Sequence, residues 1–180
     1  IWTTSEGGGT IVAVIDTGLQ INHEDIAENV WQNPGEIEGN GIDDDGNGYI
    51  DDINGWSFIE DSGDVNDQHG HGTHVAGTIA AVGNNGIGII GVAPQTRLLP
   101  IQGLNAYGSG NHADLIAAIY YAVDMGADVI NLSWGGYHYS RLISDAVEYA
   151  EEKGIVVIAA AGNDATNASY HYPSGYQTVI

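Results

Sequence analysis

One short stretch decides the fold: Thr10-Ile11-Val12-Ala13-Val14-Ile15-Asp16-Thr17-Gly18. Its apolar, β-branched character predicts a buried strand over residues 10–16, and Thr17-Gly18 ends that strand in a turn. A run that does not alternate with polar residues is typical of a parallel sheet covered on both faces. Residues 98–101, 129–134 and 155–161 have the same character and predict three further strands of this kind.

Helices are predicted between these strands. Residues 74–82 are rich in Ala, and residues 112–125 and 141–153 each place their apolar side chains on one helical face. Asn111 and Ser140 precede the last two segments and are suitable N-caps. Strands that alternate with helices predict an α/β fold with a mostly parallel sheet and right-handed connections.

Composition limits what the chain can do. Its 180 residues are 43% hydrophobic, which predicts one domain over residues 1–180. The sequence has no Cys, so disulfides and a Cys nucleophile are excluded. With 24 Asp and Glu against 3 Lys and Arg, a nucleic-acid partner is excluded, because phosphate binding needs a cationic surface. No apolar run approaches the roughly 20 residues that span a bilayer, so no membrane partner is expected.

Polar residues occur where the predicted strands end. Asp16, Ser133 and Asn163 lie at or just past strand ends, and these ends meet at one edge of a parallel sheet, where ligands bind. Each residue also has a purely structural explanation, since Asp and Asn commonly close turns. The strand ends therefore predict a shared crevice without defining its chemistry.

A cluster of histidines precedes the first predicted helix, in the stretch His69-Gly70-His71-Gly72-Thr73-His74. The glycines allow the backbone to approach a site closely, and the helix that follows can hold the imidazole of His71 in place. Three neighbouring histidines are also ligands that a zinc site uses. A hydrolytic site and a transition-metal site both remain open from these residues alone.

Taken together and in order, the motifs resemble the subtilisin-like serine protease (subtilase) family. The resemblance covers nearly the whole chain and implies a subtilisin-like three-layer fold, with a mostly parallel central sheet and helices on both faces. It implies the N-terminal two-thirds of the catalytic domain, truncated at the C-terminus; the apolar run over residues 178–180 likewise favours a fragment. The motifs are Ala13–Gly18, His71–Thr78, Gly91–Pro94, Asn131–Gly136, Ala160–Asn163 and Tyr172–Ser174.

The resemblance implies a serine endopeptidase with an Asp-His-Ser triad. In it, His71 is general base and then general acid, Asp16 orients His71, and Asn163 donates a hydrogen bond to the oxyanion. Two strand segments would enclose the substrate backbone, an outer apolar subsite would adjoin them, and residues 160–162 would form a wall of the primary specificity pocket. The implied substrate-binding residues are Ser109, Gly110, His112, Leu115, Ser133, Trp134, Gly135, Ala160 and Gly162.

The family's nucleophile is missing from this chain. No Gly-Thr-Ser-Met/Leu-Ala motif occurs, and Ser133 matches a substrate-binding position instead. Without a nucleophile only residual catalysis is left, so the chain alone is predicted to be inactive. The alternative is a non-catalytic subtilase-like protein that binds peptides or calcium.

Acidic residues concentrate over residues 36–67, which we interpret as a calcium-loop insertion. Residues 43–54 match an EF-hand-type loop, with Gly48 at its sharp turn and Asn54 in place of the bidentate Glu of position 12. Carboxylates this close repel one another unless a cation intervenes, although a solvated acidic loop is the alternative. The predicted Ca²⁺ ligands are Asp43, Asp45, Asn47, Asp51 and the carbonyl of Tyr49.

The resemblance implies further properties. A second Ca²⁺ site would use Asp25, the side chain of Asn85 and three carbonyls, and a third would use Asp61 and Asp64. Protein or peptide substrates, a propeptide or inhibitor as a further partner, a monomeric state when complete, and a secreted location are also implied. The three carbonyls of the second site are those of Val82, Ile87 and Ile89.

Overall fold

The computed structural model describes residues 2–180 and places five strands in one all-parallel sheet, in the order β2-β3-β1-β4-β5. The four predicted strands are present, with ends that differ by one or two residues, and β2 is an addition that the sequence pattern did not indicate. The strands are β1 (Ile11–Asp16), β2 (Trp56–Ser57), β3 (Arg97–Gln102), β4 (Val129–Leu132) and β5 (Val156–Ala159).

Three α-helices connect the strands: α1 (His71–Ala80), α2 (His112–Asp124) and α3 (Arg141–Glu152). Both predicted N-caps are confirmed: the side chain of Asn111 accepts from the Asp114 N–H, and that of Ser140 accepts from the Ile143 N–H. Helix α1 begins three residues before the predicted start, so His71 lies in its first turn. Two 3₁₀ turns, η1 (Ala27–Asn29) and η2 (Ala168–Tyr170), complete the regular structure.

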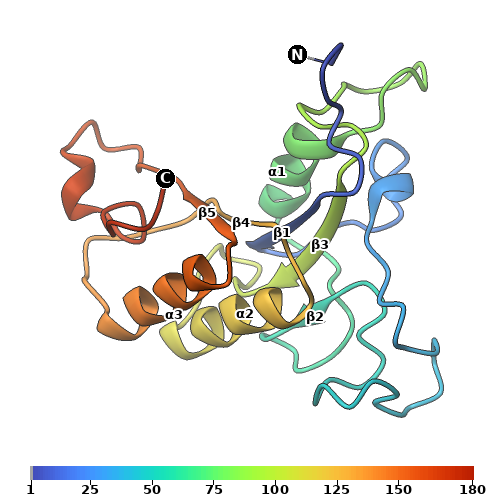
Figure 1. Cartoon of the computed structure of the whole chain (residues 1–180), viewed down its shortest axis with the longest axis horizontal. Coiled ribbons are helices and arrows are strands. Elements are labelled where there is room, and N and C mark those ends of the chain that lie inside the picture. The colour runs from blue at the N-terminus through green and yellow to red at the C-terminus, as the bar shows by residue number, and fades with distance from the viewer. Residues whose placement is uncertain (1) are drawn as a thin grey trace.

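The molecule has three layers, because alternate residues of the central strands face different helices (Figure 1). Val12 and Val14 of β1 pack in one apolar cluster with Ala76 and Ala80 of α1. Ala13 and Ile15 belong to the other, larger cluster, which contains the buried faces of α2 and α3. This arrangement confirms the predicted α/β fold with helices on both faces of the sheet.

Strand β5 departs from the prediction of a strand buried on both faces. Val157 is 1% exposed, but its neighbours Val156 and Ile158 are 41% and 40% exposed. The reason is that α3 covers one face of β5, whereas α1 packs on β1 and β3 and does not cover the other. Beside β5, Val179 forms a parallel bridge with Val157 and extends the edge of the sheet.

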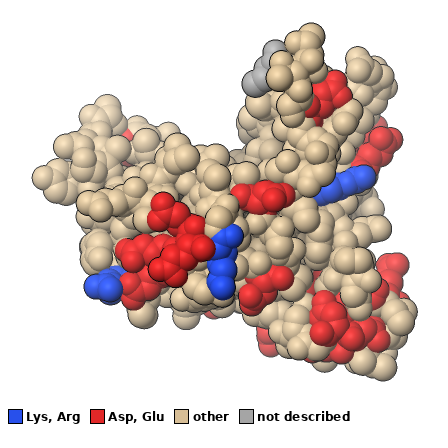
Figure 2. Space-filling view, in the orientation of Figure 1, with Lys and Arg blue, Asp and Glu red and all other residues tan. Residues whose placement is uncertain are grey.

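The acidic segment over residues 36–67 is mostly irregular and contains only the short strand β2. Figure 2 shows one group of Asp and Glu where this segment lies and another over the region of α3. Within residues 2–180, no helix is both long enough and apolar enough to cross a membrane.

Candidate active site

An Asp–His pair lies where β1 and α1 meet. Asp16 is the last residue of β1 and is fully buried, and the Nδ1 of His71, the first residue of α1, lies 2.7 Å from its Oδ1. The His71 side chain is 44% exposed. An imidazole that donates Nδ1–H to a carboxylate keeps Nε2 free as a proton acceptor. The pair is therefore arranged for general-base chemistry at the open side of the ring.

Gly72 allows α1 to approach the end of β1 this closely. A Cβ at position 72 would overlap the carbonyl oxygen of Gly18 and lie 3.2 Å from the Cβ of Asp16. The N–H of Gly72 also donates a 2.9 Å hydrogen bond to the hydroxyl of Thr17, the residue that follows Asp16. A larger residue at position 72 would separate the helix from the strand and lengthen the Asp16–His71 contact.

Asp67 stabilises the same junction between β1 and α1 by hydrogen bonds to both sides. This role was not predicted from the sequence. The buried carboxylate of Asp67 accepts from the hydroxyl of Thr17 at 2.9 Å, from the N–H groups of His69 and Gly70, and from both the N–H and hydroxyl of Thr73. Burial alone would raise the pKa of Asp67, but these hydrogen bonds together hold the pKa below its ordinary value. An acidic residue just before a helix N-terminus was the available sequence signal.

Asn163 lies beyond β5 and borders the same hollow as His71. Its side chain makes no hydrogen bond to residues 2–180, so its amide is available as a donor. Ser133, Trp134 and Gly135 from the end of β4 line this hollow as well. Of the three strand-end residues that the sequence placed in one crevice, Ser133 and Asn163 line the hollow, whereas Asp16 is fully buried and contacts the hollow's His71.

A second hollow of about 280 Å³ adjoins the first and shares Trp134 and Gly135 with it. The Trp134 indole N–H donates a 2.9 Å hydrogen bond to the carbonyl of Ile15. This bond fixes the indole ring between β1 and the two hollows. Every predicted substrate-binding residue lines one hollow or the other. Ser109, Gly110, His112 and Leu115 line the second, and Ser133, Ala160 and Gly162 line the first.

The three histidines do not form a metal site. The rings of His69 and His71 lie 6.2 Å apart, and His74 is exposed on α1. Across residues 2–180, one set of three acidic or His side chains converges within 4.8 Å, and it contains no histidine. The zinc hypothesis therefore has no geometric support.

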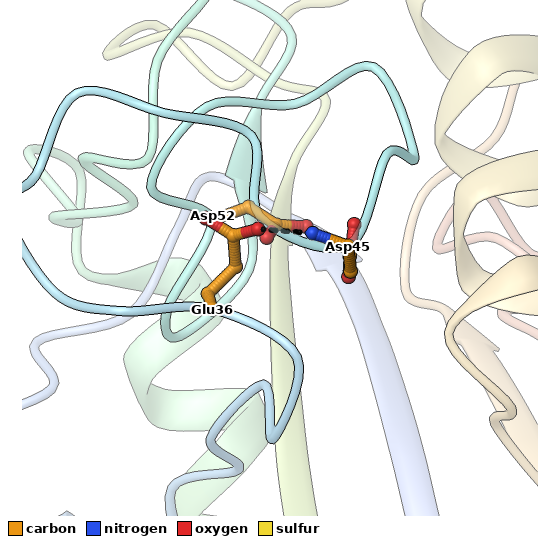
Figure 3. A group of neighbouring side chains, drawn as sticks. All are labelled: Glu36, Asp45 and Asp52. Carbon is orange, nitrogen blue, oxygen red and sulfur yellow. Dashed lines mark hydrogen bonds between the residues drawn. The ribbon is translucent and has the colours of Figure 1, made fainter.

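That converging set consists of Glu36, Asp45 and Asp52 (Figure 3). Asp45 was a predicted ligand, whereas Glu36 and Asp52 were not. Asp52 is fully buried, and burial raises its pKa, although hydrogen bonds from Tyr121, Asn33 and Asn47 oppose this effect. The carboxylate oxygens of Glu36, Asp45 and Asp52 suit a hard cation such as Ca²⁺.

The other predicted ligands of the acidic segment have backbone partners. Asp43 accepts from the N–H groups of residues 46, 47 and 48, and Asp51 from those of residues 40 and 41. The ring of Tyr49 packs against Trp56, and Asn54 donates to the carbonyl of residue 31. The carboxylate of Asp43 thus holds the backbone of residues 46–48 in a turn.

The residues of the predicted second calcium site also meet. The buried Asp25 carboxylate accepts from the Asn85 side chain at 2.7 Å and from the Ile89 N–H at 2.9 Å, and the Asp25 carbonyl accepts from the Val82 N–H. The hydrogen bond from the Asn85 side chain, and after it the one from the Ile89 backbone N–H, lower the pKa of Asp25. Ile87 donates its N–H to Asn85. Of the predicted third pair, Asp64 accepts from the Asn66 N–H, and neither Asp61 nor Asp64 joins the converging acidic set.

Comparison with known proteins identifies the family, because the model of the subtilase family matches residues 7–180. The chain belongs to the subtilase family. Over 99% of its length, this subtilase is 40% identical to thermitase of Thermoactinomyces vulgaris and 39% identical to the thermophilic serine proteinase of Bacillus sp. strain AK1. It is also 38% identical to subtilisin-like protease 1 of Plasmodium berghei. The chain spans 56%, 39% and 31% of the lengths of these three relatives.

Proposed function

We propose that this chain supplies the Asp–His pair, the oxyanion donor and the peptide-binding cleft of a serine endopeptidase. The observation that carries the proposal is the 2.7 Å contact from Asp16 to His71, with Asn163 lining the same hollow. Relatives over nearly the whole chain are named as a serine proteinase and as subtilisin-like proteases, which supports this chemistry.

The nucleophilic serine in this proposal belongs to sequence outside residues 1–180. Its hydroxyl oxygen attacks the peptide carbonyl carbon while Nε2 of His71 accepts the hydroxyl proton. The carbonyl electrons move to the oxygen, and the Asn163 amide donates a hydrogen bond to the resulting oxyanion. His71 then gives the proton to the leaving amine as the peptide bond breaks. In the second half of the reaction, water attacks the acyl-enzyme carbonyl with His71 again as the base, and His71 then returns the proton to the serine oxygen as the carboxylic acid is released.

Asp16 has two parts in this cycle. Its contact with Nδ1 fixes the imidazole tautomer in which Nε2 is the base, and its negative charge stabilises the imidazolium that forms. Because Asp16 is fully buried, water does not screen this charge effectively. Asp67 acts indirectly: its hydrogen bonds to Thr17 and Thr73 hold the end of β1 and the start of α1 in their relative positions.

We also propose that the protein binds Ca²⁺ in the acidic segment. Glu36, Asp45 and Asp52 would hold the ion, which would supply positive charge that offsets the mutual repulsion of these carboxylates. Its role would be structural, since the segment is irregular and strongly acidic. Asp25 with the loop of residues 82–89 is a second candidate, of lower priority because it offers a single carboxylate, whereas three carboxylates converge in the acidic segment.

The substrates proposed are extended protein or peptide segments, because two adjoining hollows run along the ends of β1, β4 and β5. A propeptide or a protein inhibitor would use the same cleft. We propose that the complete enzyme is secreted and monomeric. A secreted location fits an EF-hand-type loop that lacks its position-12 Glu, because extracellular calcium modules function with weak affinities of roughly 10⁻⁴–10⁻³ M.

Fluorophosphonate labelling followed by intact-mass measurement tests the proposed chemistry. We expect the full gene product, with calcium present, to gain one label, and the 180-residue chain alone to gain none. His71→Ala in the full product should abolish labelling, because the serine then has no base. His74→Ala is the matched control, since His74 is exposed on the same helix and borders neither hollow.

Two results would contradict the proposal. Labelling that survives in His71→Ala would show that this imidazole does not activate the nucleophile. A full gene product that takes up no label but still binds peptides would instead support the non-catalytic peptide-binding alternative.

A further inference from the structure

The imidazole of His171 occupies the slot between the ends of β4 and β5. His171 is only 6% exposed, and its ring lies between two glycines that face each other across this slot. A Cβ at Gly135 would overlap the ring, and a Cβ at Gly162 would lie 3.0 Å from Cδ2 and 3.1 Å from Nε2. Both glycines are needed because the ring fills the space that their side chains would take.

This slot opens into the proposed active site. His171 lines the same hollow as His71 and Asn163. Ser133, Trp134, Gly135, Ala160 and Gly162 border the same hollow. In the proposed protease, a peptide carbonyl would lie between His71 and Asn163, so the side chain of the same peptide residue would enter the hollow beside them. The imidazole of His171 fills the part of this space that lies between Gly135 and Gly162.

The ring is held firmly in this position. The Ser174 hydroxyl donates a 3.0 Å hydrogen bond to the His171 carbonyl, and its oxygen lies 3.2 Å from Nδ1 of the His171 ring. The ring of Tyr137 makes an edge contact with the imidazole, with 5.5 Å between the ring centroids. Because the hydroxyl proton is already donated to the carbonyl, the Ser174 oxygen accepts from Nδ1–H. In the neutral ring, Nε2 then keeps its lone pair. It makes no hydrogen bond to residues 2–180 and is not fully enclosed.

We propose that His171 is a specificity-determining residue that closes the pocket for the side chain preceding the cleaved bond. The pocket then accepts short side chains, such as those of Ala and Ser, and excludes aromatic ones. This inference rests on the proposed protease function and names its substrate class. The reason is steric: a benzyl group needs the space that the imidazole already occupies, and close-packed interiors do not yield that volume cheaply.

Chromogenic tetrapeptide anilides that differ only in their last residue, Ala or Phe, test the proposal on the full gene product. We expect wild type to favour the Ala substrate in kcat/KM. His171→Gly should shift the Phe-to-Ala ratio toward Phe by on the order of tenfold or more, since even one methylene in a pocket changes rates by about 10–200-fold. His171→Phe, which keeps the slot filled, should retain the preference for Ala.

Tyr170→Gly is the control for loop flexibility, because Tyr170 precedes His171 but is 67% exposed and lines neither hollow. A Phe-to-Ala ratio that is the same in wild type and His171→Gly would overturn the inference and leave the protease function standing. If no substrate is cleaved, the protease function fails, and binding of the tetrapeptide acids by ligand-observed NMR decides the role of the slot. Tighter binding of the Phe-ended acid to His171→Gly than to wild type would support a closed slot, and equal binding would overturn it.

Discussion

The hydroxyl of Tyr121 donates a 2.6 Å hydrogen bond to the carboxylate of Asp52. Tyr121 lies on α2 and Asp52 in the acidic segment, and both are almost completely buried. Burial, together with the neighbouring Asp52, raises the pKa of the Tyr121 hydroxyl, so this group stays a donor at neutral pH. The bond joins an irregular, strongly charged segment to the regular core of the molecule.

Tyr121→Phe should therefore destabilise the protein while leaving the packing of its ring largely unchanged. The substitution leaves a buried carboxylate without one of its donors, and we expect the free energy of unfolding to fall by about 1–3 kcal/mol. Urea unfolding followed by fluorescence measures the change. Tyr120→Phe is the matched control, because Tyr120 is 38% exposed and its ring packs on Tyr149. Equal losses in the two variants would show that the Asp52 contact contributes nothing.

Removing a carboxylate from the acidic set should weaken calcium-dependent stability. We expect CaCl₂ to raise the Tm of the protein, with a gain in stability of about 2.7 kcal/mol at a hundredfold excess over Kd. In Asp45→Asn and Glu36→Gln this gain should be largely lost. Glu38→Gln in the same segment should keep it, because Glu38 lies outside the converging set. A calcium response that is unchanged in both test variants would place the ion elsewhere, for example at Asp25.

Asp67→Asn should alter the acid sensitivity of the protein. The folded-state pKa of Asp67 lies below its ordinary value of 3.8, so its ionised form contributes stability above about pH 4. That contribution declines as the pH falls through the lower, folded-state pKa. The difference in unfolding free energy between wild type and Asp67→Asn should thus be constant near neutral pH and shrink in acid.

Unfolding curves recorded between pH 7 and pH 2 measure this difference. Asp64→Asn serves as the control, since Asp64 is exposed and accepts from a single neighbouring N–H. A difference that does not depend on pH would mean that Asp67 acts through its shape and not through its charge.

Asn163→Ala should reduce the rate of peptide hydrolysis without weakening substrate binding. An oxyanion donor acts only when negative charge develops, so kcat should fall by about 10²–10³-fold while KM stays close to that of wild type. Steady-state kinetics on the full gene product separates the two constants. A variant whose KM rises while kcat is unchanged would show that Asn163 binds the ground state of the substrate and does not stabilise the oxyanion.

Most of the secondary structure could be predicted because it depends on local patterns. The apolar runs gave four strands, and the caps Asn111 and Ser140 fixed the starts of two helices. The Asp16–His71 contact was expected from the family motifs, because these motifs identify both residues even though 55 residues separate them. Strand β2 was missed because two residues are too few to show a period.

The rest could not be predicted because it depends on contacts between distant segments. Asp67 resembles any solvated acid in sequence, and its role appears only when Thr17 and Thr73 surround it. Glu36 lies outside the EF-hand pattern, yet the fold brings it to Asp45 and Asp52. Val156 and Ile158 look like core residues, but their exposure depends on which helix covers which strand.

The sequence by itself determined the class of fold, the family and the Asp, His and Asn that carry the proposed chemistry, because the hydrophobic period and the order of the motifs can be read along the chain without knowledge of its contacts. Only the tertiary structure decided how His171 closes the slot between Gly135 and Gly162, and how Tyr121 anchors the acidic segment. Those features are set by which side chains compete for the same buried space, and that competition exists only after the strands and helices have packed.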